Sequence, residues 1–138
     1  MPLVRISLRQ GKPEEYRQKI SEGVHQAMVE AINVPAQDRF QVITEYPVGG
    51  LIYDPTYLGV KRSDDIVFIQ ITLNMGRSVE QKRVLYRRIA ELLGKEPGVR
   101  PEDLLVNLVE VAKENWSFGN GEVSHFCKRR SALPQTVA

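Results

Sequence analysis

The stretch Val4-Arg5-Ile6-Ser7-Leu8 returns 65 residues later as Ile69-Gln70-Ile71-Thr72-Leu73, and this pair of segments decides the fold. Both segments alternate apolar and polar side chains, a pattern typical of half-buried β-strands. The likeness continues along the chain without a gap. Further matching pairs at the same separation are Gly11 and Gly76, Lys12 and Arg77, Glu15 and Glu80, Ile20 and Leu85, Val24 and Ile89, Val34 and Val99, Asp38 and Asp103, and Glu45 and Glu110. The chain is therefore predicted to contain one structural unit twice.

Each unit is predicted to run strand, tight turn, helix, strand. The first helix is indicated by an apolar residue at every fourth position, namely Tyr16, Ile20, Val24, Met28 and Ile32. Pro13 is tolerated in a first helical turn, and Pro35 follows where the helix has ended. The second helix has the apolar residues Leu85, Ile89, Leu92 and Leu93.

The ends of the second helix also have sequence signals. Ser78 with Gln81 three residues later resembles a capping box, and Gly94 is expected to stop the helix. The returning strands are expected over 39–46 and 104–111. Helices between strands of like direction predict two βαβ units with parallel strand pairs and both helices on one face. The segment 48–55 is expected to be a loop or short hairpin, and 116–121 a turn.

A sheet with helices on only one face leaves the other face bare. A protein of 138 residues has little left to cover that face. Self-association is the natural way to bury it.

The composition limits the classes of function. A chain of this length with 42% hydrophobic residues suits one ordinary domain, and its net charge is only +2. The dense basic run 128–130 has no interleaved aromatic residues, so we expect no nucleic-acid partner. No stretch approaches 18 apolar residues and no signal peptide is evident, so we expect no membrane partner. The single cysteine, Cys127, suits a reducing, cytoplasmic location.

We expect neither a metal nor an organic cofactor. His25 and His125 lie far apart in the sequence, and Cys127 has no partners at the spacing of a metal site. No phosphate-binding glycine loop is present.

Pro2 is the first candidate for chemistry. Removal of Met1 would leave Pro2 as a secondary amine at the start of an apolar strand. An α-amino group titrates near about 7.7–8.0, and burial or nearby cations lower that pKa. Such an amine can act as a base, an acid or a nucleophile near neutral pH. The sequence leaves open whether Met1 is removed and which protonation state Pro2 holds.

With these features the chain resembles the tautomerase superfamily, within the branch that contains malonate semialdehyde decarboxylase. Four local strings add to the proline and the duplicated unit: 34–41, Leu58-Gly59, Gly76-Arg77-Ser78 with Glu80-Gln81-Lys82, and Asn115-Trp116-Ser117-Phe118-Gly119. The resemblance implies an α+β fold of the tautomerase (MIF-like) type, with a mixed four-stranded sheet, two helices on one face, and a homotrimer. It predicts one domain over 1–121, built of repeats at about 2–46 and 67–111, and a C-terminal tail over 122–138.

The resemblance also implies a site. The start of the first strand would lie beside the end of the third, so that Pro2 and Arg77 share a pocket. Arg77 would bind a substrate carboxylate and lower the pKa of the Pro2 amine by charge repulsion. An arginine at a strand-to-helix turn suits this role, because the helix start also attracts anions. Asp38 would work with Pro2 by positioning water or substrate.

Other residues are expected around this pocket. Trp116 and Phe118 would form its wall and exclude water. Related decarboxylases and dehalogenases carry two arginines in the turn, whereas 73–77 holds only one, with Asn74 as an uncharged hydrogen-bond donor. Tyr46 and Tyr53 are candidates to close over the pocket. His25 resembles in position a histidine of the cis-haloacrylate dehalogenases but is offset from the apolar stripe, so its role stays open.

Three functions follow. The leading one is a cofactor-independent tautomerase in which Pro2 is the general base on a small keto or enol carboxylic acid. The alternative is a decarboxylase, hydratase or dehalogenase with a cationic Pro2. A third possibility, from another class, is a non-catalytic trimeric scaffold. The sequence does not identify the physiological substrate.

Overall fold

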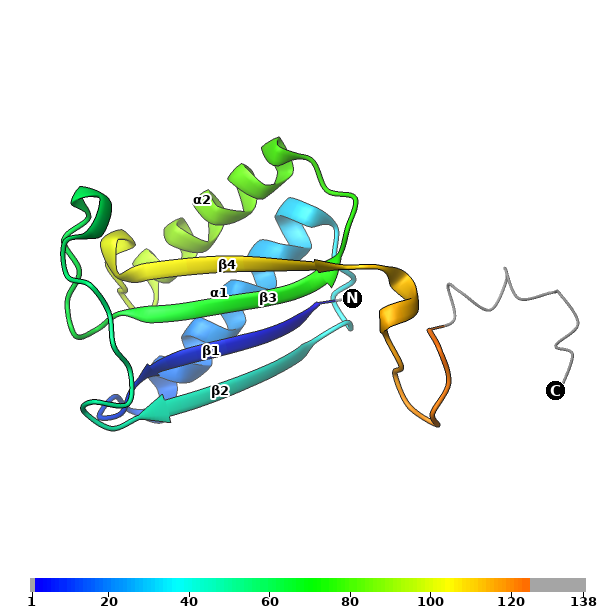
Figure 1. Ribbon diagram of the computed structural model, residues 1–138. Helices are drawn as coiled ribbons and strands as arrows, with labels where there is room; N and C mark the ends of the chain where they lie inside the picture. The colour runs from blue at the N-terminus through cyan, green and yellow to red at the C-terminus, as the bar shows by residue number, and fades with distance from the viewer. Residues whose placement is uncertain (1, 125–138) are drawn as a thin grey trace, which may run out of the picture.

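The computed structural model describes residues 2–124 and contains a four-stranded sheet with two long helices packed against it (Figure 1). His125, Cys127 and the basic run 128–130 lie outside the described residues. In chain order the main elements are β1 (Leu3–Arg9), α1 (Glu14–Ile32), β2 (Phe40–Tyr46), β3 (Val67–Asn74), α2 (Val79–Lys95) and β4 (Leu104–Val111).

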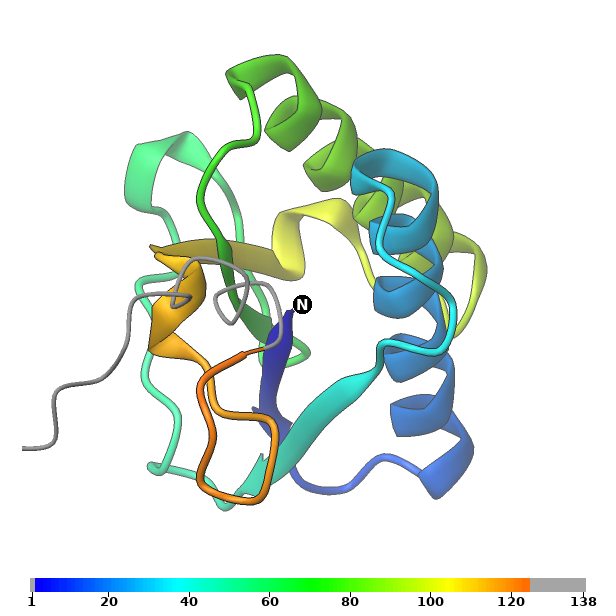
Figure 2. The ribbon, with the colours of Figure 1, turned by 90° about the vertical axis from the view of Figure 1, so that its right-hand side faces the viewer.

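The strand order is β2-β1-β3-β4. β1 pairs with β2 and β3 pairs with β4 in parallel, while β1 and β3 run antiparallel in the middle. Each half is therefore a βαβ unit, and both helices lie on the same face of the sheet (Figure 2). The predicted fold class is confirmed.

The core lies between that face and the helices. Alternate residues of the two central strands are buried, among them Ile6 of β1 and Ile69 of β3. They pack against the apolar stripes of the helices, which are those predicted except that Tyr16 and Leu92 are only partly buried. The helices contact each other closely at Gly23, where an added Cβ would lie 2.6 Å from Cδ1 of Leu93.

The helix ends follow the sequence signals in part. The Ser78 hydroxyl accepts a hydrogen bond from the Gln81 backbone, and the Gln81 side chain accepts one from the Ser78 backbone, which confirms the capping box. Gly94 does not stop α2, which continues to Lys95. Glu96, the residue after α2, is extended, because a residue that precedes a proline, here Pro97, avoids helical dihedral angles.

The two repeats share backbone details as well as side-chain pattern. The turn that follows the first strand of each repeat contains a glycine with positive φ, 117° at Gly11 and 124° at Gly76. Four hydrogen bonds form two pairs 65 residues apart: Gln10 N–H to Tyr46 O (2.9 Å) and Met75 N–H to Val111 O (3.0 Å), and Asp38 N–H to Pro35 O (3.0 Å) and Asp103 N–H to Arg100 O (2.9 Å). The two halves of the chain therefore share backbone geometry as well as sequence pattern.

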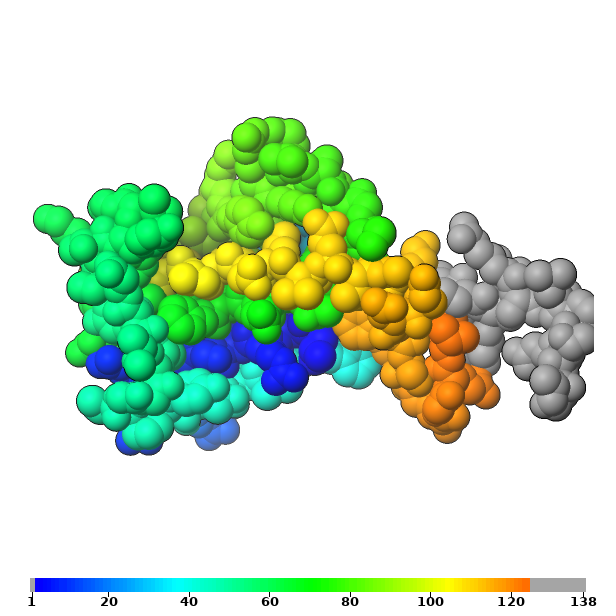
Figure 3. Space-filling view, in the orientation of Figure 1, coloured from blue at the N-terminus to red at the C-terminus, as the bar shows by residue number. Residues whose placement is uncertain are grey.

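The other face of the sheet has no helix over it (Figure 3). Val42, Leu105 and Val109 are exposed on this face. The segments 47–66 and 112–124 lie at opposite ends of the sheet, and 48–55 is a loop, as predicted (Figure 1). Within residues 2–124, no helix has the length and apolar character needed to cross a membrane.

Candidate active site

β1 begins at the end of the sheet that faces the viewer in Figure 2, and Pro2 directly precedes it. It is buried directly before β1, where Leu3 pairs with both Phe40 and Thr72. If both pairings are extended by one residue, Pro2 lies opposite Arg39, which precedes β2, and opposite Leu73 of β3. The start of the first strand thus lies beside the end of the third, as the resemblance implies.

Arg77 belongs to the turn that leaves this end of β3 and enters α2. Its Nη1 donates a hydrogen bond of 2.9 Å to the backbone carbonyl of Asn74. A guanidinium has five N–H donors, so this bond leaves a fork able to hold a carboxylate. Ser78, the next residue, caps α2, and the positive end of the helix dipole adds to the attraction for an anion.

Asn74 and Trp116 are joined across the site. The indole Nε1 of Trp116 donates a 2.7 Å hydrogen bond to Oδ1 of Asn74. An indole nitrogen is only a donor, so the amide oxygen of Asn74 must face it and the amide NH2 points elsewhere. The NH2 group is then available as a donor to a substrate oxygen.

Aromatic rings form one wall of this region. Trp116 and Phe118 stack with ring centroids 5.4 Å apart, and Phe118 lies 6.3 Å from Phe40 at the start of β2. The backbone N–H of Ser124 donates a 2.9 Å hydrogen bond to the carbonyl of Trp116, which closes the segment 116–124 into a loop. Sequence reasoning missed Phe40 as part of this wall, although its place opposite Leu3 beside Pro2 could have indicated it.

Asp38 lies in the turn that leads into β2, one residue before Arg39, which lies opposite Pro2. Both of its carboxylate oxygens are buried. The turn is attached to α1 by a 2.9 Å hydrogen bond between Nε2 of His25 and the carbonyl of Ala36. His25 is thus partly packed against this turn.

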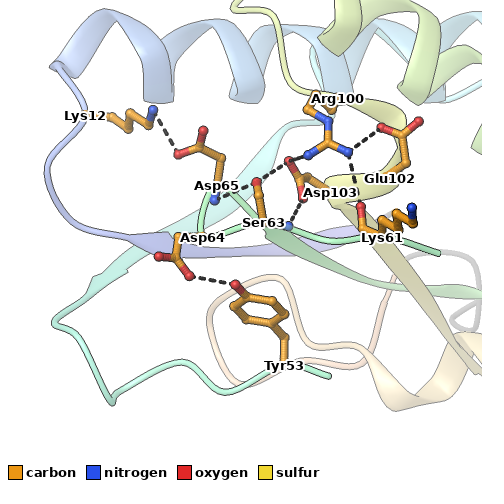
Figure 4. A network of polar contacts seen from close by, with 9 residues as sticks. All are labelled: Lys12, Tyr53, Lys61, Ser63, Asp64, Asp65, Arg100, Glu102 and Asp103. Carbon is orange, nitrogen blue, oxygen red and sulfur yellow. Dashed lines mark hydrogen bonds and ion pairs between the residues drawn. The ribbon is translucent and has the colours of Figure 1, made fainter. Parts of the chain in front are cut away.

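The opposite end of the sheet has the positions that the repeat relates to Pro2, Asp38 and Arg77, and side chains of the chain itself occupy them (Figure 4). Asp103, which matches Asp38, is fully buried and accepts hydrogen bonds of 2.7 Å from both the backbone N–H and the hydroxyl of Ser63. Lys12, which matches Arg77, pairs with Asp65 at 3.0 Å, and this bond raises the pKa of Lys12. Val67, which matches Pro2, lies within the chain and has no free amine.

Two tyrosines also lie at this opposite end. Tyr53 donates a 2.6 Å hydrogen bond to Asp64, which raises the pKa of Tyr53, and Tyr46 ends β2 opposite Arg9. The expectation that they close over the Pro2 pocket is wrong. The reason is that the loop 47–66 leaves β2 at the end of the sheet remote from Pro2.

A carboxylate that was given no role from the sequence lies next to the Arg77 turn. Glu110, near the end of β4, is paired with Lys82 of α2, and its carboxylate lies near the backbone N–H of Gly76. The bond from Lys82 is the main reason that the pKa of Glu110 is lowered, and the charge of Arg77 adds to it. Among residues 2–124, no cluster of three or more His, Cys, Asp or Glu side chains could hold a metal.

Known proteins share this sequence and architecture. A family model described as tautomerase enzyme matches residues 38–119, and another with the same description matches residues 2–61. The probable tautomerase YusQ of Bacillus subtilis (strain 168) is 49% identical over 121 residues, which cover 88% of this chain and 95% of that protein.

Solved structures agree with these matches. The FG41 malonate semialdehyde decarboxylase inhibited by 3-bromopropiolate is 34% identical with a TM-score of 0.86, covering 96% of this chain and 99% of that one. A fused 4-OT symmetric trimer, 21% identical with a TM-score of 0.72 and covering 88% and 94% of the two chains, shares the fold. The chain therefore belongs to the tautomerase superfamily of enzymes, in the branch that contains malonate semialdehyde decarboxylase.

Proposed function

We propose that this protein is a cofactor-independent tautomerase in which the amine of Pro2, freed by removal of Met1, is the general base. Its substrate is a small keto or enol acid whose carboxylate binds Arg77. The observation that carries the proposal is the register of β1 and β3, which brings Pro2 to the sheet end where the Arg77 turn begins. The cytoplasmic location predicted from the sequence is part of the same proposal.

The reaction moves one proton within the substrate. The neutral amine of Pro2 removes the proton of an enol hydroxyl, and the electron pair left on oxygen forms the carbonyl as the C=C pair moves to carbon. That carbon takes a proton from the protonated amine, which regenerates the base. The positive charge of Arg77 favours the neutral amine, because like charges disfavour protonation.

The remaining site residues support this step. The amide NH2 of Asn74 donates to the substrate oxygen on which negative charge develops. Asp38 positions the substrate or a water beside the amine. The wall of Phe40, Trp116 and Phe118 reduces access of bulk water, which strengthens these electrostatic contacts.

Decarboxylation or hydration of a three-carbon oxo or unsaturated acid, with a cationic Pro2, is the second candidate. Two observations favour it: the 34% identity to a malonate semialdehyde decarboxylase, and Asp38, because a carboxylate near an amine stabilises the protonated form. The turn 73–77 has one arginine, which favours the tautomerase. Membership in a superfamily of enzymes does not support the third possibility, a non-catalytic scaffold.

We also propose that the protein is a homotrimer. The exposed apolar residues of the uncovered face, Val42, Leu105 and Val109, would be buried between subunits. A fused 4-OT of the same fold forms a symmetric trimer. Light scattering at micromolar concentration should give the mass of three chains, and a monomer would contradict the assembly.

The function is tested by comparing two substrates and two N-termini. Mass spectrometry first establishes that Met1 is absent. Phenylenolpyruvate should then be converted to its keto form faster than malonate semialdehyde loses carbon dioxide. The same protein with a short N-terminal extension, in which the nitrogen of Pro2 is an amide, should be inactive. Normal turnover by the extended protein would exclude Pro2 as the base, and fast decarboxylation would make the second candidate the first.

A further inference from the structure

The Lys82–Glu110 pair is used by no step of the proposed reaction, yet it contacts the turn that holds Arg77. Glu110 is near the end of β4 and pairs in register with Leu73 of β3. Its carboxylate is paired with Lys82 in the first turns of α2 and lies near the backbone N–H of Gly76, the residue before Arg77. One side chain thus joins the sheet, the turn and the helix around Arg77.

The turn needs such a connection. Gly76 has a φ of 124°, a conformation that a glycine backbone holds only weakly because many others are open to it. The turn is fixed on one side by the hydrogen bond from Met75 N–H to the carbonyl of Val111, and on the other by the cap of α2 at Ser78. The Glu110 carboxylate lies near the backbone N–H of Gly76, between these two points. The side chain of Glu110 is about one-third exposed (33%), so the contact lies at the protein surface.

The first repeat contains the same pair in a place where no substrate is expected. Arg17 matches Lys82, and Glu45 matches Glu110; they form an ion pair of 3.0 Å. Arg17 also donates a 3.3 Å hydrogen bond to the carbonyl of Lys12, the counterpart of Arg77. The duplication therefore supplies an internal control: similar chemistry at both ends of the sheet, with a candidate carboxylate anchor at only one.

We propose that Glu110, held by Lys82, is a positioning residue that fixes the Gly76-Arg77 turn so that the Arg77 guanidinium faces the substrate carboxylate. This inference rests on the proposed function, because it assigns Glu110 a role through Arg77. Its carboxylate contacts the turn rather than the substrate. Loss of Glu110 should then weaken binding of the carboxylate with little effect on the proton transfer, because Pro2 belongs to a different element.

The test compares Glu110→Ala with Glu45→Ala. Both variants lose an ion pair between a helix and a strand, and both should lower the melting temperature by a similar small amount. Glu110→Ala should raise KM for phenylenolpyruvate by about 10- to 100-fold, the effect of misplacing a binding group, with kcat within about threefold. Glu45→Ala should leave both constants unchanged. Glu110→Gln, which keeps an acceptor for Gly76 and nearly the same shape, should restore part of the lost affinity.

A binding measurement separates this inference from the proposed function. Trp116 is the only tryptophan of the chain and is hydrogen-bonded to Asn74, so its fluorescence reports on the site. Titration with pyruvate, a small monocarboxylate, should give a Kd that rises in Glu110→Ala by the same factor as KM and is unchanged in Glu45→Ala.

The outcomes are distinct. If the unmodified protein does not convert phenylenolpyruvate but the Kd shift is found, the proposed function fails and the positioning role stands. If the two alanine variants share the same KM and Kd, the positioning role fails while the function stands. The absence of a saturable pyruvate response in the unmodified protein would overturn both. If Glu110→Ala does not fold, Glu110→Gln carries the comparison, and a Kd equal to that of Glu45→Gln would overturn the inference.

Discussion

Replacing Arg77 by alanine removes the charged group that we expect to bind the substrate. In the structure this guanidinium donates to the carbonyl of Asn74, and it precedes the cap of α2. A hydrogen bond between charged partners contributes about 1.5–3 kcal/mol. At about 1.4 kcal/mol for each factor of ten, Arg77→Ala should lower kcat/KM for a monocarboxylate substrate by about 10- to 150-fold.

The assay follows conversion of phenylenolpyruvate at several substrate concentrations. Arg77→Lys keeps the charge but loses the planar fork, so its loss should be intermediate. The matched control is Lys12→Ala, because Lys12 is the repeat partner of Arg77 at the other end of the sheet and pairs with Asp65. Removing it should change stability slightly and leave kcat/KM unaffected.

Two results would refute the reasoning. In one, Arg77→Ala keeps kcat/KM within about threefold of the unmodified protein, so that no charged contact of this size exists. In the other, Lys12→Ala loses as much activity as Arg77→Ala. Either the substrate carboxylate then binds at the Lys12 end of the sheet, or both variants lose activity because they unfold. Circular dichroism of each variant distinguishes these last two cases.

Three further predictions concern other parts of the chain. Asn74→Arg should raise the rate with malonate semialdehyde relative to phenylenolpyruvate, since a second cation polarises a carbonyl; an unchanged ratio would contradict this. Gly23→Ala should lower the free energy of unfolding in urea by up to about 2 kcal/mol, because overpacking against buried Leu93 costs about 1–3 kcal/mol and helix propensity returns only about 1 kcal/mol. The hydrogen bond from Arg88 lowers the pKa of Glu30. The stability that this pair contributes is therefore present above pH 4.5, the ordinary pKa of a glutamate, and is lost as the pH falls through the lowered pKa. Glu30→Gln should reduce the dependence of the free energy of unfolding on pH in that range, and an unchanged pH dependence would contradict the role of the pair.

Much of the fold was predictable because the signals are local. An alternating strand such as Ile69–Leu73 specifies its own buried face, and the Ser78 capping box specifies where α2 begins. A gapless repeat then fixes the second half from the first. The stop of α2 was misplaced because Gly94 is compatible with a helix as well as with its end, and Pro97 decided the boundary.

The site was predictable only in outline. The sequence itself indicated Pro2, the resemblance added its pairing with Arg77, and the strand register explains why they share one end of the sheet. The bond from Trp116 to Asn74 and the contact of Phe118 with Phe40 join segments that have no common periodicity, so the sequence could not reveal them. The placement of Tyr53 failed for the same reason, because a loop without a repeat partner has no register.

The pKa of the Pro2 amine tests the central claim most directly. An NMR titration of the protein containing isotopically labelled proline, with loss of Met1 established by mass, measures this value without any assumption about the substrate. A general base must be largely neutral at working pH, so we predict a pKa of about 6–7, below the usual α-amino range of about 7.7–8.0. A pKa near or above about 9 would mean that Pro2 is cationic at neutral pH, which would contradict the tautomerase mechanism and favour the decarboxylase.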